Sequence, residues 1–385
     1  MKLIYLNKVK FPGSIPATVF SAMNAHGFAE NGIETYFIAR TNKKKQPDFD
    51  FTDYFGFEPN PMLHNRLFSG GFAHTSSNEF FYIRACRWIL EHRDEEFDVI
   101  VTRDPGFLPY LVMLKRMLPR VTIIYQSHNF YVDLKKRSDL KPVNKRKYHL
   151  FERTCIPHVD GIMALQTAHR DLYRQYTDTP VFHGWPGVAR IDELPAHERM
   201  ENRTVGYIGS FQDFKGIESV IRCFKQAYQP GWKLILAGGR QENEINFARE
   251  VLNRYSLEDR AEITGWLSYE ELRKVMRKMT IGLLLLDDTF YNRCLTAPSK
   301  LFDYLSGGIP VVASDLPSLS DFIRHDDEAL LVPPGDIYAA SEALSVLMRE
   351  PERFQRISRN ALARAHDLTW KKATARMVEF IQSVM

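Results

Sequence analysis

The sequence predicts an α/β protein with two parallel, doubly wound sheets of the Rossmann-like kind, one in each half of the chain. Short apolar runs rich in β-forming residues alternate with helical patterns along all 385 residues, as expected for parallel strands joined by crossover helices. The runs fall into two similar sets, and a segment without sustained periodicity separates them. The composition, 44% hydrophobic and 25% charged, is that of a globular chain of about two domains.

Six apolar runs in the first half are expected to be strands, each followed by a stretch long enough to cross back over the sheet. They cover residues 3–6, 35–39, 99–102, 121–125, 162–165 and 181–182. Six more follow in the second half, at residues 205–209, 233–237, 261–264, 281–286, 310–313 and 329–332.

These sets define an N-terminal domain over residues 1–183, a linker over 184–203 and a C-terminal domain over 204–368. The linker carries Pro186, Gly187 and Pro195 among many charges, which is typical of irregular structure. Residues 369–385 form a final amphipathic helix, with Thr369 as a possible N-cap. Its apolar face must pack against another element and consists of Trp370, Ala373, Met377, Phe380 and Ile381.

Several classes of protein are excluded at this stage. The longest wholly apolar run, 281–286, is far shorter than the roughly 18 residues of a membrane-spanning helix. The N-terminus lacks the apolar region of a secretory signal, so a cytoplasmic protein is expected. Four widely spaced cysteines fit neither a disulfide framework nor a zinc site and are expected to be buried thiols: Cys86, Cys155, Cys223 and Cys294.

The net charge of +4 is small, but one segment between residues 135 and 153 is strongly basic. The segment contains eight Lys or Arg residues and only two acidic residues, Asp139 and Glu152. Two interpretations stay open. The segment is a solvated loop and helix face, or it is attracted to an anionic surface such as the inner membrane leaflet or a charged acceptor. The cations are Lys135, Lys136, Arg137, Lys141, Lys145, Arg146, Lys147 and Arg153.

Common catalytic signatures, including Walker A, GxGxxG, GxSxG and HExxH, are absent from the sequence. An acidic triplet at Asp48 and Asp50 follows no strand, and we interpret it as a loop. The strand-to-helix junctions are the remaining candidates for a functional site. One is the loop over residues 7–16, where Gly13 and Ser14 precede a helix that Pro16 can open, an arrangement that suits a phosphate.

Two junctions in the second half are more informative. Strand 205–209 ends before Ser210, and Lys215 then lies at the start of the next helix, where its charge and the helix dipole favour an anion. In the segment 296–313, helical periodicity places Lys300, Asp303 and Tyr304 opposite an apolar face. Lysine and aspartate on one face can meet a diphosphate and a ribose, or can simply form a surface ion pair.

These segments, in this order, resemble the GT-B glycosyltransferases of the large retaining "glycosyl transferases group 1" (family 4-like) type. The likeness covers nearly the whole chain and is weaker before residue 180. It rests on the segments 206–209 with 215–216, 234–239, 263–267, 298–313 and 331–336, and on the tail through residue 370. It implies a GT-B fold with an interdomain cleft and a C-terminal helix that crosses back to the N-terminal domain.

The resemblance also implies roles for individual residues. Lys215 and Lys300 take the place of diphosphate ligands that act in catalysis, together with His128 at the end of a strand. Asp303 takes the place of the glutamate that holds the donor ribose. The turn beside the nucleobase corresponds to Gly265, Trp266 and Leu267. The complete expected donor-binding set is Gly13, Ser14, Ser210, Gly265, Trp266, Leu267, Pro298, Ser299 and Asp303.

Two positions depart from the family pattern. Ser210 stands where an arginine usually contacts a phosphate, and Leu295 stands where an acid usually binds the donor sugar. Asp287 or Asp288, at the end of the preceding strand, is a possible substitute for that acid.

The resulting expectation is a glycosyltransferase that moves a sugar from a nucleotide-diphosphate sugar to a glycan, lipid-linked or other hydroxyl acceptor, in a setting such as polysaccharide biosynthesis. The resemblance implies retention, no metal and no cofactor, and no nucleic acid is expected as a partner. Peripheral contact with an anionic membrane is a further possibility. Two alternatives are a nucleotide-sugar epimerase or sugar phosphorylase on the same fold, and a non-catalytic nucleotide-sugar-binding subunit.

Overall fold

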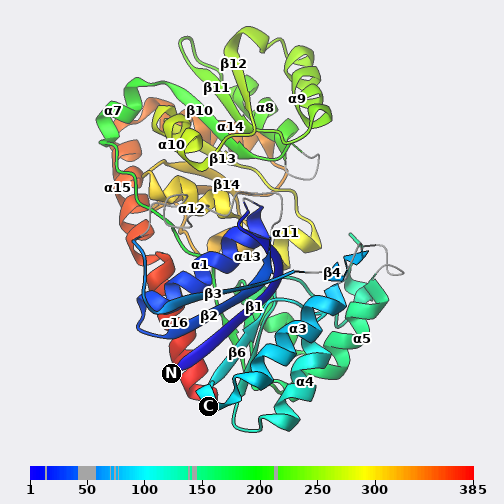
Figure 1. Cartoon of the computed structure of the whole chain (residues 1–385). Helices are drawn as coiled ribbons and strands as arrows, with labels where there is room; N and C mark the ends of the chain where they lie inside the picture. Colours follow the sequence, from blue (N-terminus) through cyan, green and yellow to red (C-terminus); the bar gives the residue numbers. More distant parts are fainter. Residues whose placement is uncertain are drawn as a thin grey trace. The chain divides into compact units, whose positions relative to one another are not determined.

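Two parallel sheets organise the chain, as the sequence predicts (Figure 1). The computed structural model describes residues 1–13, 15–41, 58–69, 71–72, 75–76, 78–137, 139–140, 145–211 and 216–385. The chain divides into unit 1, residues Met1–Gly187 with Trp370–Met385, and unit 2, residues Val188–Thr369. The acidic triplet at Asp48 and Asp50 lies outside the described residues.

Unit 1 is built on a seven-stranded parallel sheet in the order β3-β2-β1-β6-β7-β8-β9. Its strands are β1 (Lys2–Phe11), β2 (Glu34–Thr41), β3 (Leu63–Phe68), β6 (Val99–Thr102), β7 (Thr122–Gln126), β8 (Gly161–Ala164) and β9 (Val181–His183). Its helices are α1 (Pro16–Glu30), α3 (Asn78–Glu91), α4 (Leu108–Met117), α5 (Arg146–Cys155), α6 (Thr167–Arg174) and α16 (Trp370–Val384). Short elements are η1 (Arg93–Glu95), η2 (Leu134–Lys136), η4 (Ile156–His158) and the pair β4 (Gly71–Phe72) with β5 (Thr75–Ser76).

Strand β3 was not predicted from the sequence. It lies at the edge of the sheet, pairs with β2 alone, and has a largely exposed centre. An exposed edge strand needs no apolar alternation, so its sequence carries little strand signal.

The final helix packs within unit 1, although unit 2 precedes it in the sequence. Helix α16 lies beside α1 (Figure 1), and the Asn31 side chain at the end of α1 donates hydrogen bonds to the Lys371 carbonyl at 2.9 Å and the Thr374 hydroxyl at 3.0 Å. Gly27 allows this approach, because a Cβ atom there would lie 2.6 Å from the Thr374 hydroxyl oxygen. The predicted amphipathic helix is confirmed.

Unit 2 is built on a six-stranded parallel sheet in the order β12-β11-β10-β13-β14-β15. Its strands are β10 (Thr204–Gly209), β11 (Lys233–Gly238), β12 (Ala261–Gly265), β13 (Ile281–Leu284), β14 (Val311–Ser314) and β15 (Ala329–Val332). Its longer helices are α8 (Ile217–Ala227), α9 (Glu242–Arg254), α10 (Tyr269–Lys278), α12 (Ser299–Ser306), α14 (Ile337–Arg349) and α15 (Pro351–Asp367). The shorter ones are α7 (Ala196–Glu201), α11 (Phe290–Cys294), α13 (Pro317–Ser320) and η6 (Glu258–Arg260).

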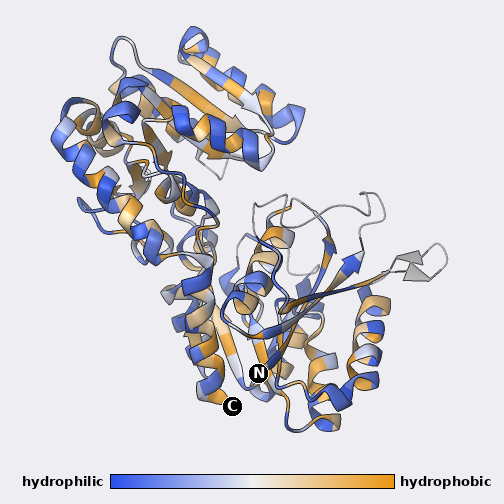
Figure 2. Cartoon of the chain, turned by 60° about the vertical axis from the view of Figure 1, so that its left-hand side comes forward, coloured by the Kyte–Doolittle hydropathy of each residue, from blue (hydrophilic) through white to orange (hydrophobic). Residues whose placement is uncertain are grey.

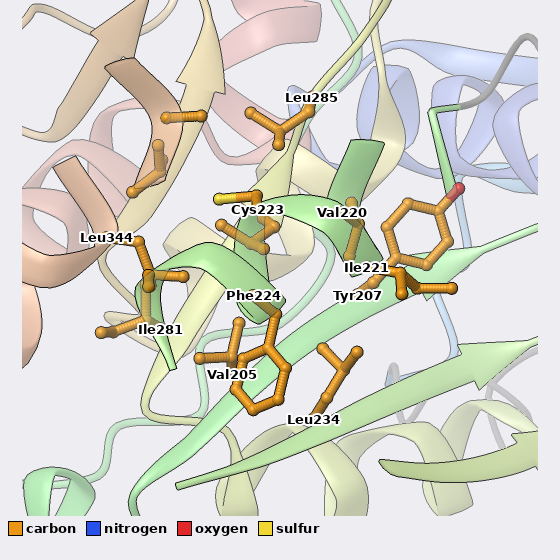
Figure 3. Packing of buried hydrophobic residues seen from close by; sticks show 14 of the residues in the cluster. Val205, Tyr207, Val220, Ile221, Cys223, Phe224, Leu234, Ile281, Leu285 and Leu344 are labelled. Carbon is orange, nitrogen blue, oxygen red and sulfur yellow. The ribbon is translucent and has the colours of Figure 1, made fainter. Parts of the chain in front are cut away.

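The core of unit 2 lies between its sheet and two helices, α8 and α14. Val220, Ile221 and Phe224 of α8 are fully buried against strand residues such as Val205 and Leu234 (Figure 3). In Figure 2 hydrophilic and hydrophobic residues alternate along the helices, as expected for helices with one face on a sheet.

The predicted strands are all found, with ends that shift by a few residues. Strand β13 ends at Leu284 rather than at residue 286. The four cysteines are free thiols, but only Cys155 and Cys223 are buried, while Cys86 and Cys294 are half-buried. The expectation of four buried thiols was therefore wrong for two of them.

Candidate functional site

The carboxyl ends of β10 and β13 form the topological switch point of unit 2. The strand order reverses between these two strands, and open α/β sheets bind ligands at that place. The pairing of β10 with β13 covers only the first two residues of β13. The two strands therefore part toward their carboxyl ends, and something else must satisfy the freed backbone groups of β10.

Tyr304 of α12 performs this task. Its hydroxyl accepts a hydrogen bond from the Ile208 amide at 3.0 Å and lies 3.2 Å from the Gly206 carbonyl. Gly282 makes room for it, because a Cβ atom there would lie 2.9 Å from the tyrosine ring. Helical periodicity alone had placed Tyr304 on the polar face of α12, which was wrong: the side chain is fully buried and structural.

The half-buried Lys300, in the first turn of α12, extends along the end of β10. Its ammonium donates a hydrogen bond to the Tyr207 hydroxyl at 3.0 Å and lies 4.1 Å from the centroid of the Tyr207 ring. Gly209, with φ of 134°, permits this approach, because a Cβ atom there would lie 3.1 Å from the Lys300 ammonium nitrogen. A cation is thus held at the carboxyl end of β10, beside the switch point.

Asp303 lies one turn after Lys300 and is half-buried. Its carboxylate has no hydrogen-bond or ion-pair partner within the described part of the chain, so the surface ion pair with Lys300 is not formed. Burial raises the pKa of this carboxyl group from 3.8 to about 7, and no nearby cation offsets the rise. Asp303 is therefore an acceptor without a donor.

The turn after β12 holds the three residues expected beside a nucleobase. Gly265 has φ of 71°, in the left-handed region that favours glycine, and a Cβ atom there would have no neighbour within 4 Å. Trp266 is 49% exposed, and the Arg240 guanidinium lies 5.4 Å from the centroid of its ring. Leu267 is half-buried and precedes a capping box in which Ser268 and Glu271 bond each other at the start of α10.

The remaining donor-binding candidates of unit 2 surround the same strand end. Pro298 is buried as the N-cap of α12, while Ser299 is exposed in its first turn. Ser210 directly follows β10, and its carbonyl accepts a hydrogen bond from the Tyr207 hydroxyl at 2.8 Å. Lys215 lies outside the described residues.

The structure separates the two acids considered as substitutes at the Leu295 position. Leu295 itself is only 1% exposed and belongs to the apolar interior. Asp288 forms a bidentate ion pair with Arg293, one contact of which measures 2.9 Å. Asp287 is half-buried, its carboxylate has no partner among the described residues, and burial raises its pKa. Asp287 is therefore the better candidate.

Unit 1 has its own switch point, between β1 and β6. Gly13 follows β1, and a Cβ atom there would lie 2.8 Å from the Lys10 carbonyl oxygen, so only glycine fits without a shift. Ser14 lies outside the described residues. Asp104, which follows β6 and is 2% exposed, accepts hydrogen bonds from the Lys8 ammonium at 2.9 Å and the Tyr82 hydroxyl at 2.5 Å.

His128, at the end of β7, is half-buried. Burial, and to a smaller extent the charge of Arg103, lower the pKa of its imidazole to about 3. The ring is therefore neutral at physiological pH, and its buried Nδ1 atom has no hydrogen-bond partner among the described residues.

Arg103, Asp104 and Lys8 lie beside this switch point and were not predicted from the sequence. The signal was present, because an arginine and an aspartate directly follow the strand 99–102.

Within the described ranges, no group of three or more His, Cys, Asp or Glu side chains is arranged to hold a metal ion. Across the same ranges, no helix combines the length and the apolar character needed to cross a membrane.

Comparison with known proteins agrees with this architecture. A family model described as "Glycosyl transferase 4-like domain" matches residues 17–180, and one described as "Glycosyl transferases group 1" matches residues 202–350. The solved structure of a sucrose-phosphate synthase from Thermosynechococcus elongatus is similar over 100% of this chain and 98% of that one, with a TM-score of 0.75 at 16% identity. The structure of Anabaena HepE in complex with UDP and glucose covers both chains fully, with a TM-score of 0.71 at 15% identity.

The curated relatives match only part of this chain. The alpha-D-kanosaminyltransferase of Streptomyces kanamyceticus is 22% identical over 66% of this chain and 68% of its own length. An exopolysaccharide phosphotransferase of Streptomyces coelicolor is 29% identical over 35% of this chain, a match that covers only 14% of that protein.

The two parallel doubly wound sheets and the likeness to these solved structures show the GT-B fold. With family models matching both halves, the chain belongs to the group 1 glycosyltransferases.

Proposed function

We propose that the protein transfers a sugar from a nucleoside-diphosphate sugar to a hydroxyl group of a glycan or lipid-linked acceptor, with retention and without a metal. The observation that carries this proposal is the position of Lys300, whose ammonium lies at the carboxyl end of β10 beside the switch point of unit 2. A cation held there can stabilise the negative charge that develops on the diphosphate as the glycosidic bond breaks. We expect Lys215 to contribute a second positive charge.

The other donor contacts follow from the same half of the chain. The unpartnered carboxylate of Asp303 is suited to accept hydrogen bonds from the ribose hydroxyls, which would satisfy a buried acceptor. The exposed indole of Trp266, next to the open turn at Gly265, offers a stacking surface for a nucleobase. Asp287 would then take the place of the acid that binds the donor sugar.

We assign the acceptor to unit 1. His128, neutral at physiological pH, can exchange hydrogen bonds with a hydroxyl without adding charge. HepE, a structural neighbour, was solved with UDP and with glucose. UDP is for this reason the first nucleotide to test here, although the likeness itself concerns the fold.

Peripheral contact with an anionic membrane is the second part of the partner proposal. Helices α3, α4 and α5 of unit 1 expose large apolar side chains, namely Ile83 at 55%, Met113 at 61%, Met117 at 59% and Leu150 at 58%. Exposed cations accompany them, namely Arg116, Arg146 and Arg153. Such a mixed surface suits the interface of an anionic bilayer.

Not all of the basic segment is available for this contact. Arg137 is 2% exposed and bonds to Asp139 and to the Phe130 carbonyl at 2.9 Å, so it is structural. Lys147 pairs with Glu79 at 2.7 Å. Lys141 lies outside the described residues.

One experiment tests the transfer reaction directly. The whole protein is incubated with UDP-glucose and other nucleotide sugars, with and without candidate acceptors, and the products are identified by mass spectrometry. A transferase releases nucleoside diphosphate in step with a glycosylated acceptor. Conversion of the nucleotide sugar alone into its epimer would refute the proposal and favour an epimerase, and binding without turnover under all conditions would favour a binding subunit.

A further inference from the structure

A buried arginine for which the described residues supply no hydrogen-bond partner lies beside the switch point of unit 1. Arg103 directly follows β6 and is only 5% exposed. Its guanidinium lies over the ring of Phe20 in α1, with 3.7 Å between the guanidinium carbon and the ring centroid. The Nε and Nη1 atoms are buried, and neither has a hydrogen-bond partner among the described residues.

No carboxylate among the described residues balances the charge of Arg103. No ion pair joins it to a carboxylate in the part of the chain that the structure describes. The neighbouring Asp104 is engaged by Lys8 and Tyr82. Burial lowers the pKa of Arg103, but a guanidinium stays protonated in proteins. Burying an unpaired cation is unfavourable, so an arginine in this state is suited to bind an anion.

A second polar side chain is in the same condition. His128, at the end of the adjacent strand β7, has a buried Nδ1 atom without a partner among the described residues, and the charge of Arg103 acts on its imidazole. His128 and Phe20 are both half-buried, so both side chains beside Arg103 reach the protein surface. Two features thus lie together near the surface: a guanidinium and an imidazole nitrogen, each without a partner among the described residues.

We propose that Arg103, with His128 beside it, forms an oxyanion-binding site in unit 1 that takes a phosphate or carboxylate group of a substrate. The planar guanidinium fork matches the oxygens of such a group and can bind two of them at once. The oxyanion comes from the acceptor, in which case the acceptor is an anionic sugar or a phosphate-bearing molecule, or from the donor diphosphate. The assignment of a substrate rests on the proposed function, whereas the existence of the site does not.

The test measures binding of inorganic phosphate to the whole protein by calorimetry. A Lys300→Ala background weakens the anion site of unit 2, so that the remaining binding reports on unit 1. In this background, Arg103→Gln is expected to weaken phosphate at least tenfold, and Arg103→Lys, which keeps the charge but loses the fork, is expected to weaken it less. Arg120→Gln, at an exposed position in the turn after α4, is the matched control and leaves phosphate affinity unchanged. Equal phosphate affinity with and without Arg103→Gln overturns the proposal.

Two further measurements distinguish the sources and guard against misfolding. If the donor supplies the oxyanion, Arg103→Gln in the otherwise unaltered protein also weakens UDP at least tenfold; if the acceptor supplies it, UDP affinity is unchanged and only phosphate affinity falls.

The melting temperature of the ligand-free Arg103→Gln protein is expected to equal or exceed that of the parent, because an unpaired charge has been removed. A lower melting temperature with unchanged phosphate affinity in properly folded protein identifies Arg103 as structural and overturns the proposal. Phosphate binding that depends on Arg103 in a protein that transfers no sugar would refute the proposed function alone.

Discussion

Replacing Asp303 with asparagine is expected to make the ligand-free protein more stable at pH 8. Burial raises the pKa of this carboxyl group from 3.8 to about 7. The folded chain therefore binds more protons than the unfolded chain between these two values. Stability then falls as pH rises through this window, and above pH 7 the full cost of the ionised carboxylate is present. Asparagine has the same shape and no charge, so it avoids this cost.

The shift sets the size of the effect. At about 1.36 kcal/mol for each pH unit, the raised pKa corresponds to a gain of at most about 4 kcal/mol in the free energy of unfolding. Solvent screening of a half-buried group reduces the expected gain to about 2 kcal/mol. For a folding unit of this size, this corresponds to a rise in melting temperature of roughly 4 to 8 °C. Most of the gain disappears at pH 4.5, because the carboxyl group is then largely protonated in the folded protein.

The assay is thermal unfolding of the parent and Asp303→Asn proteins at pH 8 and pH 4.5, followed by titration with UDP and 2′-deoxy-UDP. Asp288→Asn is the matched control: this exposed aspartate is ion-paired with Arg293, so its change costs under about 1 kcal/mol and gives no gain at pH 8. The more stable Asp303→Asn protein is expected to bind UDP more weakly and to lose its preference for the ribonucleotide. An Asp303→Asn protein that is less stable than the parent at both pH values would refute the unpaired state of the carboxylate, and unchanged ribose selectivity would refute its role in binding.

Three further predictions concern residues near the carboxyl ends of strands in the two sheets. Lys300→Ala is expected to weaken UDP at least tenfold in calorimetry without loss of fold, whereas the exposed Lys274→Ala leaves affinity unchanged; equal affinities would remove the lysine from the donor site. Tyr304→Phe leaves the buried Ile208 amide without its acceptor and is expected to cost about 1 to 3 kcal/mol of stability in urea unfolding; a neutral effect would show that water replaces the hydroxyl. With a pKa of about 3, His128 is neutral throughout the usual assay range, so the pH profile of kcat/KM should contain no ionisation near 6.5 that His128→Gln abolishes.

The fold was predictable because its information is local. A buried parallel strand needs a continuous apolar run, and each predicted run is found in a strand. The edge strand β3 escaped for the converse reason, since it is exposed and paired on one side only. Helical periodicity placed Lys300 and Asp303 together. It could not foresee Tyr304, whose burial depends on the separation of two strands that are distant in sequence.

The dependence on contacts between distant residues also explains why Asp303 was predicted from the sequence and Arg103 was not. Spacing identifies a residue that stands at a helix start, but an unpaired state depends on every neighbour that the fold brings close. In the described chain, the carboxylate of Asp303 lacks a donor and the guanidinium of Arg103 lacks an acceptor. Each group is costly to the free protein, and each needs a different ligand chemistry, hydroxyl groups for the first and an oxyanion for the second. The two groups can therefore be satisfied by separate ligands. UDP and phosphate should each raise the melting temperature. If the acceptor carries the oxyanion, saturation with one ligand should not abolish the effect of the other.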